Sequence, residues 1–225
     1  YYLNTHTSAK EAVTSGTYSS GLQHYLAEGK KSGLSAFAPF TKITGEVGVD
    51  TVTFNGEFAS YSVDTSNKIW TVTEDFTLHT YSVESIERIA FSNKIIAYDI
   101  DENAGNTVKL LGLLLGKDQA TNKTYVGAGL KLLDDGMTYE QLMGAALDVI
   151  LGANASSLSV VELIWNNLIG PPTPADNISQ YSALIDNGAY TSAGLAIAAA
   201  NHDLNATNID LVGLAQTGVE YIPYG

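Results

Sequence analysis

The sequence predicts an α+β fold with N-terminal helices, a small antiparallel β unit and a C-terminal all-helical region that contains two related helical units. Apolar residues recur at helical spacing near the N-terminus and again over the second half of the chain. Between these segments, apolar and polar residues alternate, and β-branched and aromatic residues are frequent, as in strands. We therefore expect a helical module over residues 1–40, a β unit over 41–100 and a helical domain over 101–225.

The composition narrows the class of protein. The chain has 225 residues, enough for one large domain or two small ones. Its net charge is −13, which disfavours nucleic acid and anionic membrane surfaces as partners. Cysteine is absent, so disulfides and thiolate metal sites are excluded. No uninterrupted apolar run of about 20 residues occurs, which predicts that no segment inserts into a membrane.

The N-terminal module shows a short amphipathic helix. Ser19 and Ser20 are candidate caps, and Leu22, Tyr25 and Leu26 follow at i, i+3 and i+4. The surrounding segment, residues 21–33, resembles a helix-turn module of large secreted bacterial proteins that carry calcium-binding repeats.

The β unit is predicted from alternating segments, namely Thr51–Phe54, Tyr61–Asp64 and Ile69–Thr73. Asn55-Gly56 is a strong hairpin signal, and Ser66-Asn67 is typical of a turn between two of the strands. Residues 89–98 resemble a final hairpin. We expect these strands to form an antiparallel sheet.

The β unit also carries the most extended family resemblance in the chain. Residues 50–54, 61–63, 70–73, 83–92 and 98–105 together resemble a pattern found in RTX-type bacterial surface proteins that use type I secretion. This resemblance implies export without cleavage, by means of a C-terminal signal, and a secreted, extracellular or cell-surface location.

The helical region contains a weak internal repeat. Leu110–Gly116 matches Leu163–Gly170, and Leu132–Gly136 matches Leu184–Gly188. The glycines that close the second pair lie where a left-handed residue would end a helix. A repeated unit of this kind buries its apolar face against its neighbour, so we expect one shared core with Trp165 as an anchor.

The repeat resembles the paired helical units of the DUF4214 family, which occur near the C-termini of secreted bacterial proteins. The family's loop motif is degenerate here, at residues 116–118 and 170–174. Residues 218–224 resemble the closing segment of that family. Thr138 with Gln141 forms a capping-box pattern ahead of another helix.

No catalytic motif emerges, and we predict that the protein is not an enzyme. The chain lacks a Gly-x-Ser-x-Gly motif and a His-Glu-x-x-His motif, and its four histidines are scattered. Asp134-Asp135 is a carboxylate pair, but adjacent carboxylates after a helix are more often solvated or bound to a cation than catalytic. Gly112–Lys117 departs from a phosphate-binding loop in its spacing and lacks the Ser or Thr that would hold Mg²⁺.

The junction between the β unit and the helical domain holds the densest cluster of oxygen ligands. Asp99, Asp101 and Asn103 alternate along an extended segment, so their side chains would project to one side. Calcium accepts such ligands, and we predict a calcium site at these three residues. The alternative is that Asp101 or Asn103 caps the helix that begins near Ala104.

These observations favour a structural function. We expect a secreted, non-enzymatic protein that self-assembles into a homo-oligomer or polymer at the cell surface or in the extracellular matrix, as a surface-layer or filament subunit does. The 13 tyrosines supply contact area with a polar atom at low entropic cost. The alternative is an adhesin or carbohydrate-binding module that uses Tyr61, Trp70 and Tyr81 to bind a cell-surface glycan.

Overall fold

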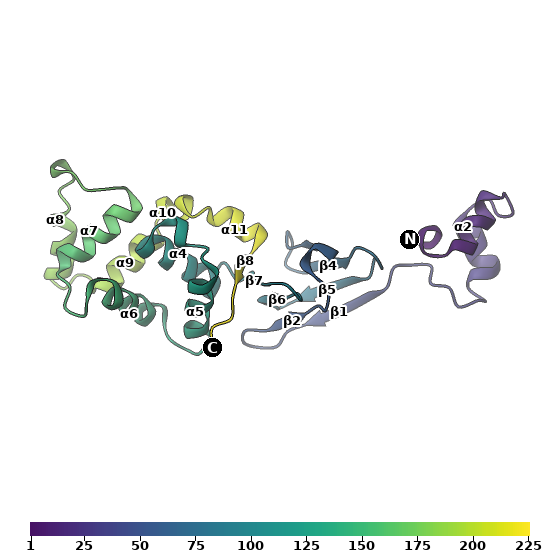
Figure 1. Ribbon diagram of the computed structural model, residues 1–225, viewed down its shortest axis with the longest axis horizontal. Helices are drawn as coiled ribbons and strands as arrows, with labels where there is room; N and C mark the ends of the chain where they lie inside the picture. The colour runs from purple at the N-terminus through teal and green to yellow at the C-terminus, as the bar shows by residue number, and fades with distance from the viewer. The chain divides into compact units, whose positions relative to one another are not determined.

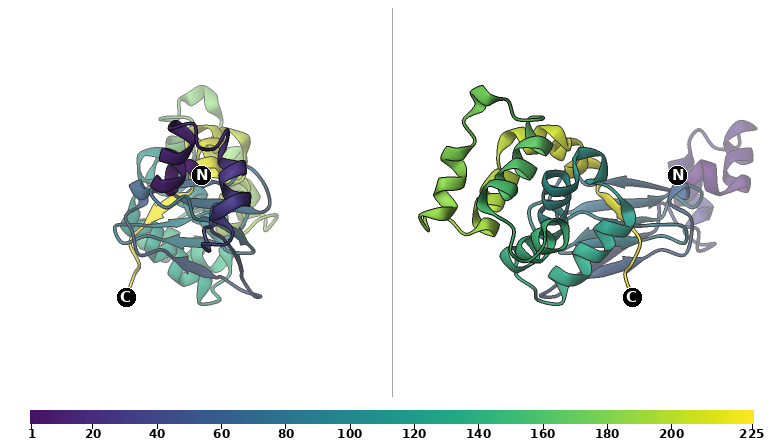
Figure 2. Two further views of the ribbon diagram at one scale, coloured as in Figure 1. Left: turned by 90° about the vertical axis from the view of Figure 1, so that its right-hand side faces the viewer. Right: turned by 60° about the vertical axis from the view of Figure 1, so that its left-hand side comes forward.

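The α+β prediction is confirmed by the computed structural model, which describes residues 1–225 (Figures 1 and 2). The chain divides into two compact units. The first comprises residues 1–50 and 54–86, and the second comprises residues 51–53 and 87–225. Each unit contains helices and one four-stranded sheet.

The first unit begins with short helices, namely α1 (Tyr2–Thr5), α2 (Thr7–Thr14), α3 (Gly21–His24) and the π-helical turn η1 (Tyr25–Gly29). Ser20 caps α3 as expected, because its side chain accepts a hydrogen bond from the Gln23 N–H at 3.2 Å. The buried His24 holds the module together through a 2.8 Å hydrogen bond between its Nδ1 and the Tyr2 hydroxyl.

The sheet of the first unit has the order β1-β5-β4-β3. Its elements are β1 (Phe40–Thr44), the 3₁₀ turn η2 (Phe58–Ser60), β3 (Tyr61–Asp64), β4 (Trp70–Glu74) and β5 (Thr80–Glu84). β3 and β4 form the expected antiparallel hairpin, with Asp64 opposite Thr71. β1 and β5, by contrast, pair in parallel, so this sheet is mixed rather than purely antiparallel.

The prediction of a hairpin at Asn55-Gly56 is wrong, because the structure has no hairpin there. Neither residue has the positive φ that a type I′ turn requires, and the preceding strand pairs elsewhere. Gly56 lies instead against the ring of Tyr61, where an added Cβ would be 2.9 Å from a ring carbon. Gly56 therefore allows the Tyr61 ring to lie close to the backbone, a contact that the local sequence does not reveal.

The second unit has a sheet of order β2-β6-β7-β8. Its strands are β2 (Thr51–Thr53), β6 (Arg88–Ala90), β7 (Ile95–Ala97) and β8 (Val219–Tyr221). β6 and β7 form the expected final hairpin, whereas β2 joins β6 in parallel. β8 corrects the all-helical expectation for the C-terminal region, because it returns after the last helix to pair with β7.

The helices of the second unit are α4 (Asn103–Leu115), α5 (Lys123–Asp134), α6 (Tyr139–Leu151), α7 (Ser157–Leu168), α8 (Ser179–Asp186), α9 (Ser192–Ala200), α10 (Asp203–Asn208) and α11 (Leu211–Thr217), with 3₁₀ turns η3 (Lys117–Gln119) and η4 (Pro174–Asp176). The capping box of α6 is present, with Thr138 and Gln141 exchanging hydrogen bonds. Gly136 and Gly188 both have positive φ after their helices, as the repeat predicts.

The core of the second unit is one cluster to which both repeats contribute, as expected. α4 lies at its centre and buries nine of its 13 residues, among them Leu113, which is fully buried. Gly105 lets this helix pack closely against the turn that precedes it, because a Cβ there would lie 1.6 Å from the Ile100 carbonyl oxygen. Trp165 differs from expectation, since it is half-buried beside the core rather than an anchor within it.

Candidate functional site

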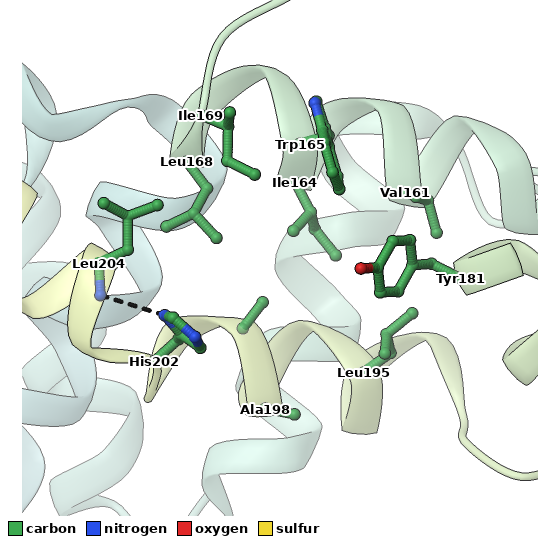
Figure 3. Close-up of a pocket in the computed structure, with 11 residues that line it drawn as sticks. Val161, Ile164, Trp165, Leu168, Ile169, Tyr181, Leu195, Ala198, His202 and Leu204 are labelled. Atoms are coloured by element: carbon green, nitrogen blue, oxygen red, sulfur yellow. Dashed lines mark hydrogen bonds between the residues drawn. The ribbon is translucent and has the colours of Figure 1, made fainter. Parts of the chain in front are cut away.

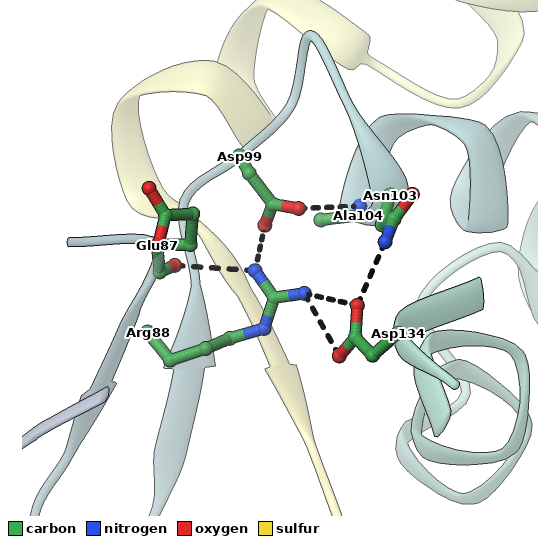
Figure 4. Close-up of polar contacts among 6 residues, drawn as sticks. All are labelled: Glu87, Arg88, Asp99, Asn103, Ala104 and Asp134. Atoms are coloured by element: carbon green, nitrogen blue, oxygen red, sulfur yellow. Dashed lines mark hydrogen bonds and ion pairs between the residues drawn. The ribbon is translucent and has the colours of Figure 1, made fainter. Parts of the chain in front are cut away.

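The junction that the sequence singled out holds a buried ion-pair network (Figure 4). Its centre is Arg88 on β6, whose side chain is 1% exposed. The guanidinium pairs with Asp99 through Nη1, and Nη2 lies 3.4 Å from both carboxylate oxygens of Asp134 at the end of α5. The Asn103 side-chain amide donates to Asp134 at 2.8 Å. One arginine thus ties the sheet to α5 through two carboxylates.

Asp99 has a second role in this network. Its Oδ2 accepts a hydrogen bond from the Ala104 N–H at 3.1 Å, in the first turn of α4. This is the interaction of a helix cap, although it comes from Asp99 and not from Asp101 or Asn103 as the capping alternative expected. The two carboxylate oxygens of Asp99 therefore bind Arg88 and a helix N-terminus.

The electrostatics of Asp99 reflect a competition. Burial disfavours the charged carboxylate and raises the pKa of Asp99, whereas the Arg88 guanidinium and the Ala104 N–H lower it; burial prevails. Tyr221 on β8 faces the same charges, and burial raises the pKa of its hydroxyl although Arg88 opposes the shift. The last strand of the chain therefore contacts the same ion-pair network as α5.

The residues of the predicted calcium site do not converge as a ready set of ligands. Asp99 binds Arg88, Asn103 presents its amide nitrogen to Asp134, and Asp101 is exposed and outside these contacts. No group of three or more Asp, Glu or His side chains in residues 1–225 is arranged to hold a metal ion. In this structure the cationic partner of Asp99 is the Arg88 guanidinium.

Calcium binding through Asp99, Asp101 and Asn103 stays a prediction, with a direct test. A cation that binds only the folded chain stabilises it by about 2.7 kcal/mol at a hundred times its Kd. If calcium binds, the thermal midpoint should therefore rise with calcium and fall with a chelator, and Asp101→Asn should remove the difference. An unmoved midpoint would leave Asp99 with only its ion pair and its helix cap.

Sequence reasoning missed Arg88, yet a signal was present. Arg88 is the single arginine in a chain with ten lysines, and it precedes an apolar strand residue, Ile89. Arginine is favoured over lysine in buried ion pairs, because its fork of N–H donors satisfies several oxygens at once. A lone arginine directly before a predicted strand is therefore a candidate for a buried ion pair.

The second unit also contains an apolar groove between α4, α5 and α6, which we call the α4–α6 groove. Its volume is about 400 Å³, and its lining has no charged side chain. Apolar side chains at its rim are exposed, namely Leu115, Tyr125, Leu132, Val149 and Ile150. The hydroxyl of Thr107, buried among these helices, has no hydrogen-bond partner.

The aromatics of the glycan-binding alternative belong to the sheet of the first unit and are half-buried. Tyr61 and Tyr81 both pack on Phe54, with ring centroids 5.2 and 4.9 Å apart. His79 stacks on Tyr81 at 4.3 Å. These contacts engage the rings in packing within the unit.

None of the helices combines the length and the apolar character that crossing a bilayer requires. Comparison of the chain with protein-family models, with curated proteins and with solved structures finds no match.

Proposed function

We propose that this protein is a non-enzymatic structural subunit that associates with copies of itself, at the cell surface or in the extracellular matrix as its sequence resemblance implies. The α4–α6 groove carries this proposal. Val149 at its rim is 86% exposed, and four other large apolar side chains surround the same groove. Exposed apolar side chains that gather around one groove can mark an interaction site.

Two features of the first unit favour a second copy of this chain as the partner. Leu22 and Leu26 lie one helical turn apart and are 68% and 64% exposed, so the apolar stripe of this module is not covered within the chain. β1 is an edge strand with four exposed residues out of five, and Lys42 is its only charged residue. Such an edge offers backbone hydrogen bonds to another strand.

The net charge of −13 opposes association of two copies, so attraction has to come from uncharged surface. Like charges on two copies repel each other, so association must come from apolar contact or strand pairing rather than from the overall field. The absence of charged side chains in the α4–α6 groove suits such contact, because no ion has to be desolvated when the surface is covered.

Val149→Glu is expected to weaken self-association at least tenfold, because the glutamate would have to be buried at the interface without a partner. The matched control is Val212→Glu on α11, since Val212 is 74% exposed and lies outside the groove. Both changes add one negative charge. Sedimentation velocity over a concentration series measures the effect. Wild-type protein that stays monomeric at every concentration would refute the proposed function, and equal effects of the two variants would refute the groove as the interface.

A further inference from the structure

A second cavity of the second unit differs in chemistry from the α4–α6 groove. It has a volume of about 350 Å³ and lies between α7, α8 and α9, with the beginning of α10 at one end (Figure 3). We propose that this cavity binds a small uncharged molecule that has a ring and one hydrogen-bond acceptor, as an aromatic ketone does.

The walls of this cavity indicate a ring-bearing ligand. Trp165 of α7 and Tyr181 of α8 face each other with centroids 5.7 Å apart and ring planes at 45°. No third ring fits between planes this close, so a ligand would pack along their edges, against Ile164 and Leu195 (Figure 3). Small-molecule sites commonly occupy about 300–1,000 Å³ and are lined by apolar and aromatic side chains, so this cavity suits a small ligand.

The polar atoms of the cavity favour an acceptor on the ligand. Nδ1 of His202 accepts a hydrogen bond from the Leu204 N–H at 3.1 Å, which caps α10. This bond requires Nδ1 to be unprotonated, so the proton of the neutral ring is on Nε2. His202 therefore presents an N–H donor at the wall of the cavity. The Tyr181 hydroxyl also points into it (Figure 3).

The charge around the cavity excludes ions as preferred ligands. None of its lining residues is Asp, Glu, Lys or Arg, so a charged ligand would lose its hydration without gaining an ion pair. The negative net charge of the chain adds long-range repulsion of anions.

The half-burial of Trp165 agrees with this assignment. A tryptophan in a core normally fills its space, whereas Trp165 keeps one side beside an open cavity. The exposure of Ile169 and Leu204 at the same cavity leaves apolar surface that a ligand would cover.

The chain contains only two tryptophans, which makes the test direct. In a ¹H–¹⁵N spectrum each gives one indole resonance, and Trp70→Phe assigns them. The probes are acetophenone, ethylbenzene as the analogue without an acceptor, and benzoate as the charged analogue. We expect acetophenone to shift the Trp165 resonance saturably while the Trp70 resonance stays in place, with weaker binding of ethylbenzene and benzoate.

Two variants measure separately what the His202 N–H donor and the aromatic ring of Tyr181 contribute to binding. His202→Asn keeps a good N-cap residue but removes the ring N–H, and it should weaken acetophenone binding about threefold to tenfold while sparing ethylbenzene. Tyr181→Leu removes an aromatic wall and should weaken both probes. Tyr190→Leu is the matched control, because Tyr190 is comparably exposed and lies outside the cavity.

Three results would overturn the proposal. Parallel, unsaturable shifts of both tryptophan resonances would show partition without a site. Equal loss of both probes in His202→Asn would remove the donor role. Benzoate that binds more tightly than acetophenone would refute the uncharged class of ligand. None of these results depends on whether the protein self-associates through the α4–α6 groove.

Discussion

Arg88→Met is expected to lower the free energy of unfolding by about 3–5 kcal/mol at neutral pH, because it leaves the buried carboxylate of Asp99 without its counter-ion. The Asp99 side chain is only 4% exposed, so water cannot replace the guanidinium. Urea unfolding measures the loss. Lys42→Met is the control, since its ion pair with Glu84 is exposed and should contribute about 1 kcal/mol or less.

The pH dependence of this loss identifies its cause. Burial already raises the pKa of Asp99 in the folded wild-type protein, and removal of Arg88 raises it further. A carboxyl with a raised folded pKa binds more protons folded than unfolded, so its contribution to stability falls as pH rises from the unfolded to the folded pKa. The loss in Arg88→Met should therefore be smaller at about pH 5 than at about pH 7.5.

A double variant tests the same cause without a change of pH. Arg88→Met/Asp99→Asn removes both charges, and the Asn oxygen can still accept the Ala104 N–H. We expect it to recover part of the stability lost in Arg88→Met, because the unpaired buried charge is gone. A double variant less stable than Arg88→Met, together with a loss independent of pH, would assign the effect to packing.

Leu113→Ala is expected to destabilise the second unit by about 2–5 kcal/mol, since it opens a cavity at the centre of the core. Leu113 is fully buried on α4, and both repeats pack around this helix. Leu158→Ala on α7 is the matched control, because Leu158 lies outside both the α4–α6 groove and the cavity. Leu158 is 42% exposed, so its truncation removes fewer contacts and should cost about 1 kcal/mol or less. Equal losses in urea unfolding would mean that α4 is not the centre of the core.

Local sequence was sufficient where neighbouring residues supply the structure. The capping box of Thr138 and Gln141 closes within one turn, and its two hydrogen bonds need no distant partner. Gly136 and Gly188 likewise have positive φ because each follows a helix end, where the chain adopts a left-handed conformation that glycine tolerates best. The β6–β7 hairpin needs only a short loop, which the Phe91 N–H closes by donating to the Lys94 carbonyl at 2.8 Å.

Local sequence misled where a distant segment competed for the same residues. The Asn55-Gly56 signal was overridden because β2 gains a partner in β6, which lies 35 residues or more along the chain. The parallel pairing of β1 with β5 has the same origin. The alternation of apolar and polar residues shows which side of a strand is buried, but not which strand lies beside it or in which direction it runs.

The sequence by itself determined the α+β class, the repeat and its helix ends, because these depend on periodicity and on residues close in the chain. Only the tertiary structure decided that β8 completes the second sheet and that Asp99 meets Arg88 and Ala104. The physical reason is that Asp99 has oxygen atoms suited equally to a calcium ion, a helix cap or an arginine. Which of these partners it binds depends on what the fold places beside it.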